Sequence, residues 1–180
     1  MVADGMGGHT HGAMASRAVI DYLVAAIDRI SNPASCAELI DEANQQLFRL
    51  MREHENALGM GTTLVAAFMT ADRMVTFNVG DSRCYLFSSG QLVQLSYDDV
   101  PDGESNSFGR RRSHALTQAL GGSSLPVAIE PHITVDAPLA PGETLLLCSD
   151  GLTDMVGNQI IRSTMSTTND LLQAAGKARR

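Results

Sequence analysis

Three apolar stretches of this chain each end at an aspartate with a glycine beside it, and this repeated pattern constrains the fold most. The stretches are residues 2–5 (VADG), 75–81 (VTFNVGD) and 145–151 (LLLCSDG). Apolar runs of this kind predict buried strands, and the glycines predict turns in which the backbone comes close to a ligand. Carboxylates beside bare carbonyl groups suit a hard cation such as Mg²⁺ or Mn²⁺. Asp-Gly and Gly-Asp are also common turn pairs, but the three together indicate a metal site.

The composition excludes several classes of protein. A chain of 180 residues, 44% of them hydrophobic, is long enough for one domain with a real core. Its net charge of −7 argues against nucleic acid as a partner, and no apolar run approaches the ~20 residues that cross a bilayer. The cysteines, Cys36, Cys84 and Cys148, are odd in number and lie in apolar contexts, which predicts buried, reduced thiols. We therefore expect a cytoplasmic protein with neither a membrane nor a nucleic acid as partner.

The first third of the chain predicts two helices. Residues 12–30 carry apolar side chains at helical spacing, which is typical of a helix with one buried face. A second helix is predicted to follow Asn32, a favourable N-cap, with Pro33 in its first turn. Ser35 and Glu38 have the spacing of a capping box.

The rest of the chain predicts mainly strands. They are expected at residues 62–69, 74–79, 84–87, 91–95, 129–135 and 144–148. Residues 97–114 lack periodicity and change from acidic to basic, which predicts a mobile surface segment. Two short helices are expected at residues 158–165 and 169–178. Helices followed by antiparallel strands and further helices indicate an α+β fold.

Five short motifs occur in a familiar order and spacing. They are VADGMGGH at residues 2–9, GTT at 61–63, NVGDSR at 78–83, LTQALG at 116–121 and CSDGLTD at 148–154. With these motifs the chain resembles the bacterial form of the metal-dependent protein serine/threonine phosphatases of type 2C, the PPM-type family. The resemblance implies two antiparallel β-sheets flanked by helix pairs, an α-β-β-α sandwich, which agrees with the pattern of predicted elements.

The resemblance also implies a role for each matching aspartate. Asp4 and Asp150 are the expected catalytic metal ligands, with Asp4 between two ions and the carbonyl of Gly5 binding one of them. Asp81 matches the aspartate of a third, weaker metal site, and Asp154 is a candidate for that site or for a supporting position behind the ligands. The expected cofactors are two or three Mn²⁺ or Mg²⁺ ions. The resemblance assigns no residue to substrate binding.

The implied activity is hydrolysis of phosphoserine and phosphothreonine on proteins by a metal-activated water. The expected partners are phosphorylated proteins, among them a serine/threonine kinase or its substrates. A phosphatase that acts on anti-sigma-type regulators shares the fold and is a weaker alternative. Many family members have a histidine two residues after the first aspartate, whereas this chain has Met6 there, and His9 and His11 are weak candidates for a general acid.

The chain departs from the family pattern at both ends. The family has a strand with a phosphate-gripping arginine before the first motif, and a further metal-binding aspartate and a final strand after the last one. We therefore expect residues 1–180 to form a single phosphatase-like domain, apparently truncated, that lacks its N-terminal and C-terminal strands, with residues 97–115 as a flap. We expect it to bind metal weakly and to turn over slowly. The alternative is a truncated or degenerate phosphatase-like module that acts by binding a kinase or other signalling partner.

Overall fold

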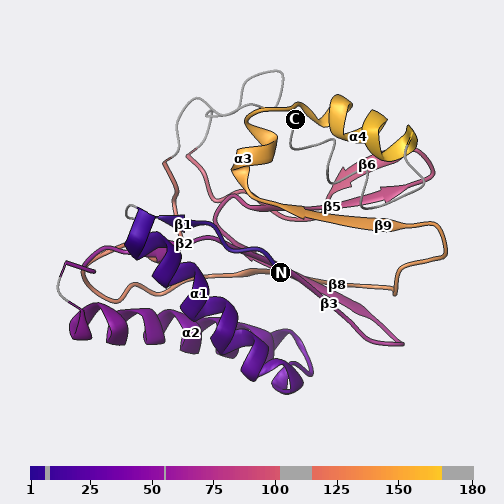
Figure 1. The fold of residues 1–180 in the computed structure, drawn as a ribbon. Coiled ribbons are helices and arrows are strands. Elements are labelled where there is room, and N and C mark those ends of the chain that lie inside the picture. The colour runs from indigo at the N-terminus through magenta and orange to yellow at the C-terminus, as the bar shows by residue number, and fades with distance from the viewer. Residues whose placement is uncertain (7–8, 55, 102–114, 168–180) are drawn as a thin grey trace.

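The computed structural model describes residues 1–6, 9–54, 56–101 and 115–167. Its elements form four layers: a pair of helices, two layers of antiparallel strands, and a second pair of helices on the far side (Figure 1). This arrangement confirms the predicted α+β sandwich. No helix in the described part of the chain combines the length and apolar character needed to cross a membrane.

The first helix pair consists of α1 (His9–Ala25) and α2 (Pro33–Glu53), with the short 3-10 helix η1 (Ile27–Arg29) between them. The predicted helix over residues 12–30 therefore begins earlier and stops sooner than expected. Asn32 caps α2 as predicted: its side chain accepts the Ser35 N–H at 3.0 Å, and the Ser35 hydroxyl accepts the Asn32 N–H at 3.1 Å. The capping box thus joins Asn32 to Ser35, and the predicted Ser35–Glu38 box is wrong.

The strands form two larger sheets and one small one, all with antiparallel pairs. The sheet next to α1 and α2 has the order β3 (Leu64–Met69), β4 (Met74–Val79), β8 (His132–Asp136). The second has the order β6 (Gln91–Gln94), β5 (Arg83–Ser88), β9 (Thr144–Cys148). The small sheet has the order β1 (Gly5–Met6), β2 (Gly61–Thr62), β7 (Leu120–Gly121).

Two predicted strands are shorter than expected for identifiable reasons. The strand predicted at residues 62–69 is divided at Thr63, whose N–H donates to the Asp4 carbonyl at 2.9 Å. The strand predicted at residues 129–135 begins only at His132. The Gln118 side chain occupies both backbone groups of Glu130, donating to its carbonyl and accepting from its N–H at 3.0 Å each. Both backbone groups of Glu130 are therefore engaged by a side chain and not by a neighbouring strand.

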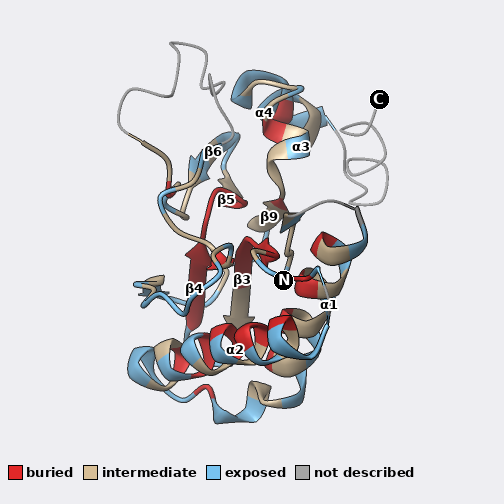
Figure 2. Ribbon diagram, turned by 90° about the vertical axis from the view of Figure 1, so that its left-hand side faces the viewer, coloured by how far each residue is buried: buried red, intermediate tan, exposed pale blue. Residues whose placement is uncertain are grey.

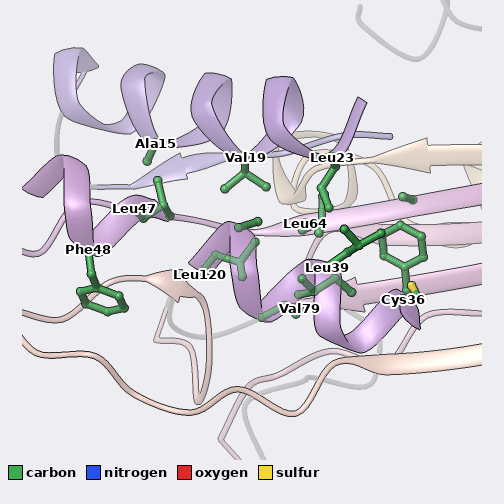
Figure 3. Close-up of a cluster of buried hydrophobic side chains, with 14 of the residues drawn as sticks. Ala15, Val19, Leu23, Cys36, Leu39, Leu47, Phe48, Leu64, Val79 and Leu120 are labelled. Carbon is green, nitrogen blue, oxygen red and sulfur yellow. The ribbon is translucent and has the colours of Figure 1, made fainter. Parts of the chain in front are cut away.

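The main core lies between α1, α2 and the sheet of β3 and β4. Strand β4 is buried along its whole length, and Val75, Phe77 and Val79 on one face join the apolar stripes of the two helices. Figure 3 shows these stripes meeting: side chains from α1, from α2 and from the strands point into one cluster. Met74, Thr76 and Asn78 alternate with them and face the other sheet layer. The red segments of α1, α2, β3 and β4 in Figure 2 mark this buried centre.

The second helix pair, α3 (Asp150–Thr153) and α4 (Asn158–Thr167), lies on the outer side of the β5–β6–β9 layer (Figure 1). The predicted helix at residues 158–165 matches α4, whereas the helix predicted at 169–178 lies outside the described residues. Tyr85 on β5 links the layers, because its hydroxyl donates to the Asn158 side chain at 3.1 Å.

The predicted mobile surface segment is wrong at its beginning. Asp98 and Asp99 are charged residues in an aperiodic stretch, yet both are held inside the fold. The Arg83 guanidinium contacts both oxygens of the Asp98 carboxylate, with the shortest distance at 2.6 Å. Asp99 is only 5% exposed. The remainder of the segment, residues 102–114, lies outside the described residues.

Candidate metal centre

Asp4 is fixed through its backbone by the start of β3. Its carbonyl accepts the Thr63 N–H at 2.9 Å and the Thr62 hydroxyl at 3.0 Å, and its own N–H donates to the Thr63 hydroxyl at 3.1 Å. Val2 lies opposite Val65 in an isolated bridge, so residues 2–6 run antiparallel to residues 61–65. The turn expected directly after Asp4 is absent, since the chain stays extended through Met6 in β1.

Gly5 is held closely against α1. A Cβ atom added to Gly5 would lie 2.0 Å from the Gly12 carbonyl oxygen, and one added to Gly12 would lie 2.6 Å from the Gly5 oxygen. These distances are far below any real Cβ contact, so the helix and the strand can approach this closely only with glycine at both positions. The position of the Gly5 backbone is therefore set by its packing on the first turns of α1.

Strand register brings Asp150 to the same edge. Arg83 at the start of β5 pairs with Cys148 at the end of β9, and Leu64 at the start of β3 pairs with Val79 at the end of β4. The ends of β4 and β9 therefore lie beside the strand end that carries Asp4. Ser149 and Asp150 follow β9 immediately and begin α3.

Asp4 and Asp150 interact directly. Burial raises the pKa of the Asp4 carboxyl, and the negative charge of Asp150 raises it further. A hydrogen bond from Ser149 acts in the opposite direction, and a hydrogen bond shared with Asp150 again raises the pKa. The structure thus joins two carboxyl groups that lie far apart in sequence, and it does so at an energetic cost to the ionised pair.

Asp81 lies on the same edge, in the turn that follows β4. It is 5% exposed and follows Gly80 in the turn between β4 and β5. The next residue, Ser82, shares a 2.7 Å hydrogen bond with the Thr63 hydroxyl, so the turn is tied to the residue that also holds Asp4. Among the described residues, no three His, Cys, Asp or Glu side chains gather closely enough to hold a metal ion. Of the three carboxylates predicted to meet, Asp4 and Asp150 are seen to interact, and the part of Asp81 in the site stays a prediction.

Asp154 is near Asp150 through the backbone of α3. Its N–H donates to the Asp150 carbonyl at 2.8 Å, and its side chain is half-buried. This contact stabilises the short helix that begins with Asp150. It places Asp154 one helical turn beyond the carboxylate pair.

Three hydroxyl residues of the site were not identified as functional from the sequence. Thr63 holds the Asp4 backbone, Ser82 binds Thr63, and Ser149 contacts the Asp4 carboxyl. Each of these residues lies inside a motif or directly beside a motif aspartate. Their position in the sequence could therefore have identified them as candidate site residues. Their partners lie far away in the sequence, so only the strand register shows what they bind.

The donor set fits a hard divalent cation. Two carboxyl groups that repel each other at a partly buried strand edge are stabilised by a cation, because its charge offsets the burial and the repulsion that raise the Asp4 pKa. A hollow of about 640 Å³ lies beside β1 and β7, and its lining includes Met6, Gly121 and Gly122.

A paired-carboxylate site at the common edge of two antiparallel sheets, flanked by helix pairs, defines a metal-dependent class of protein. The chain belongs to the protein phosphatase 2C family, whose model matches residues 1–179. It is 34% identical over 194 residues to the serine/threonine phosphatase stp of Listeria welshimeri, covering 97% of this chain and 74% of that protein. It is also 34% identical to the phosphatase PstP of Mycobacterium tuberculosis, covering 89% of this chain and 32% of that longer protein.

Solved structures of such phosphatases share the fold. The crystal structure of the Mycobacterium tuberculosis phosphatase PstP/Ppp superposes with a TM-score of 0.83 at 29% identity, covering 98% of this chain and 77% of that one. A PstP catalytic domain in complex with two manganese ions gives a TM-score of 0.79 at 29% identity, covering 98% and 76%. These matches confirm the predicted family and fold.

Proposed function

We propose that the Asp4–Asp150 edge is the active site of a phosphatase that hydrolyses phosphoserine and phosphothreonine on proteins. The observation that carries the proposal is the direct interaction of these two carboxyl groups, whose ionised state burial and mutual repulsion make unfavourable and a bound cation would stabilise. Membership of the protein phosphatase 2C family supports the reaction. The two manganese ions of the related PstP domain support Mn²⁺ or Mg²⁺ as the cofactor.

The roles of the residues follow from their positions. Asp4 and Asp150 would hold the ions through carboxylate oxygens, and Gly5 would add its carbonyl. Bound there, divalent ions would lower the pKa of a water molecule and neutralise charge on the phosphate. Thr62 and Thr63 keep the Asp4 backbone in place. Asp81 and Asp154 are proposed for a third, weaker site or for support of the first.

The wider setting is also a proposal. Residues 1–180 would act as one phosphatase domain, in which the part of the 97–115 segment that follows Asp99 forms the flap beside the site. Phosphorylated proteins are the substrate class, and a serine/threonine kinase or its targets are the proposed partners inside the cytoplasm. The family match favours catalysis over the alternative of a module that only binds a signalling partner.

The test is hydrolysis of a phosphothreonine peptide by the protein with Mn²⁺, with Mg²⁺ and with a chelator. We expect turnover with metal that the chelator removes, little turnover of a matched phosphotyrosine peptide, and loss of turnover in Asp4→Asn. Asp136→Asn is the control, since Asp136 is an exposed residue at the far end of β8. Metal-independent turnover, or an Asp4→Asn variant as active as the protein itself, would contradict the proposal.

A further inference from the structure

A second buried carboxylate, Asp99, lies outside the proposed metal centre and is surrounded by donors. One oxygen accepts the Gly80 N–H at 2.7 Å. The other accepts from the Gln118 amide at 2.9 Å and contacts the His132 ring nitrogen at 2.7 Å. A carboxylate that is 5% exposed and fully engaged in this way is unusual for a residue in a connecting segment.

Asp99 controls the backbone of Gly80. Besides the bond from the Gly80 N–H to its side chain, the Asp99 N–H donates to the Gly80 carbonyl at 3.0 Å. Both polar backbone groups of Gly80 are therefore bound by one residue. Gly80 has φ of +92°, and a Cβ there would lie 2.8 Å from the Thr63 methyl group. The turn is thus packed against Thr63 on one side and held by Asp99 on the other.

This turn leads to the metal centre in two short steps. Asp81 follows Gly80 directly, and Ser82 bonds to the Thr63 hydroxyl at 2.7 Å. The same hydroxyl accepts the Asp4 N–H at 3.1 Å. Asp99 is therefore connected to the backbone of Asp4 by its hydrogen bonds to Gly80, by the three consecutive turn residues 80–82, and by the hydrogen bonds of Thr63 to Ser82 and Asp4.

We propose that Asp99 is a positioning residue of the phosphatase: it fixes the turn that carries Asp81 against the strand end that carries Asp4. This inference rests on the proposed function. Groups behind metal ligands orient them and set the metal affinity. The Asp99 carbonyl also accepts the Thr117 N–H at 2.9 Å, which ties Asp99 to the chain just before β7.

The position requires a carboxylate. The Gln118 amide cannot turn around to suit another partner, because both of its ends are engaged by the Glu130 backbone. Its N–H therefore always points at one Asp99 oxygen, while the Gly80 N–H points at the other. An asparagine has one acceptor and one donor at its end, so Asp99→Asn would set an N–H against an N–H on one of the two sides.

The experiment measures the Mn²⁺ concentration for half-maximal activity, kcat and KM for a phosphothreonine peptide, and Mn²⁺ binding by calorimetry. For Asp99→Asn we expect a Mn²⁺ requirement raised by about 10- to 100-fold, a lower kcat and an unchanged KM. Gln118→Leu keeps the Gly80 contact and should shift the Mn²⁺ requirement less, in the same direction. If Asp99→Asn does not fold, the Mn²⁺ requirement of Gln118→Leu tests the positioning role in its place.

The matched control is Asp98→Asn in the next position. Asp98 binds Arg83 and the Gln94 side chain and does not contact the Gly80 turn, so its loss should lower the unfolding temperature and leave the Mn²⁺ requirement unchanged. A Mn²⁺ requirement that stays at the wild-type value in Asp99→Asn and Gln118→Leu, or rises equally in Asp98→Asn, would overturn the positioning role.

The two proposals fail differently. If the unmodified protein shows no metal-dependent turnover, the proposed function is contradicted. The positioning role is then tested only by the Mn²⁺ affinities of the variants, measured by calorimetry. If the unmodified protein binds no Mn²⁺ either, both proposals fall.

Discussion

The absence of a Cβ atom at Gly5 and Gly12 sets the distance between α1 and the strand that carries Asp4. We predict that Gly12→Ala destabilises the protein by about 1–3 kcal/mol, because its Cβ would lie 2.6 Å from the Gly5 oxygen. Helix propensity favours alanine by at most about 1 kcal/mol, so the clash decides the sign. The measurement is urea unfolding. Gly157→Ala is the control, since a Cβ there meets nothing within 4 Å, and an equal loss in both variants would contradict the account.

The three cysteines behave as buried thiols. Burial raises the pKa of Cys36, Cys84 and Cys148 from the ordinary thiol value of 9.0 to about 11. Above pH 9 the unfolded chain loses these protons while the native protein keeps them, so we predict that the free energy of unfolding falls between pH 9 and about 11. Urea unfolding at several pH values measures this slope. Cys36→Ala should make the slope shallower, and an unchanged slope would count against buried thiols as its cause.

At the residue scale, the sequence identified the candidate metal-binding aspartates but not the residues that hold them in place. Asp4 and Asp150 stand out because glycine follows each of them after an apolar run. Thr63 does not stand out, since its bond to Asp4 joins residues 59 positions apart. Asp99 was placed in a surface segment because charged, aperiodic sequence is normally exposed. Its burial depends on three donors that only the folded chain assembles.

At the element scale, the start of α2 offers a direct test of the observed cap. We predict that Asn32→Ala costs about 1 kcal/mol of stability, because the Ser35 N–H loses the side-chain oxygen that accepts it. Glu38→Gln should change stability by less than about 0.5 kcal/mol, because the exposed Glu38 takes no part in the capping box. Thermal unfolding of both variants measures the difference. A larger effect at Glu38 would restore the box predicted from sequence spacing.

Strand periodicity predicted most of the sheet elements, and tertiary contacts explain the differences. Strands β4 and β9 match their predicted ranges, since each is a continuous run with clear limits. The start of β8 was missed because the Gln118 side chain, 12 positions away, takes both backbone groups of Glu130. The small sheet of β1, β2 and β7 was not foreseen, because its strands have only two residues each.

For the whole molecule, metal binding should be linked to stability. We predict that Mn²⁺ at about a hundredfold excess over its Kd stabilises the protein by ~2.7 kcal/mol, which raises the unfolding temperature by roughly 5–10 °C. Without metal, Asp4→Asn should unfold at or above the temperature of the unmodified protein, because it removes the repulsion with Asp150. With Mn²⁺ the order should reverse. Equal shifts by Mn²⁺ in both proteins, seen by differential scanning calorimetry, would place the ion elsewhere.

We expect that strand register makes one metal centre from two distant carboxylates, Asp4 and Asp150. Crystals grown with Mn²⁺ and measured at the manganese absorption edge test it most directly, because anomalous density locates the ions independently of the protein atoms. We predict a peak within coordinating distance, about 2 Å, of an oxygen from each carboxylate. A peak that contacts only one of the two residues, or that lies away from this edge while the site stays empty, would contradict it.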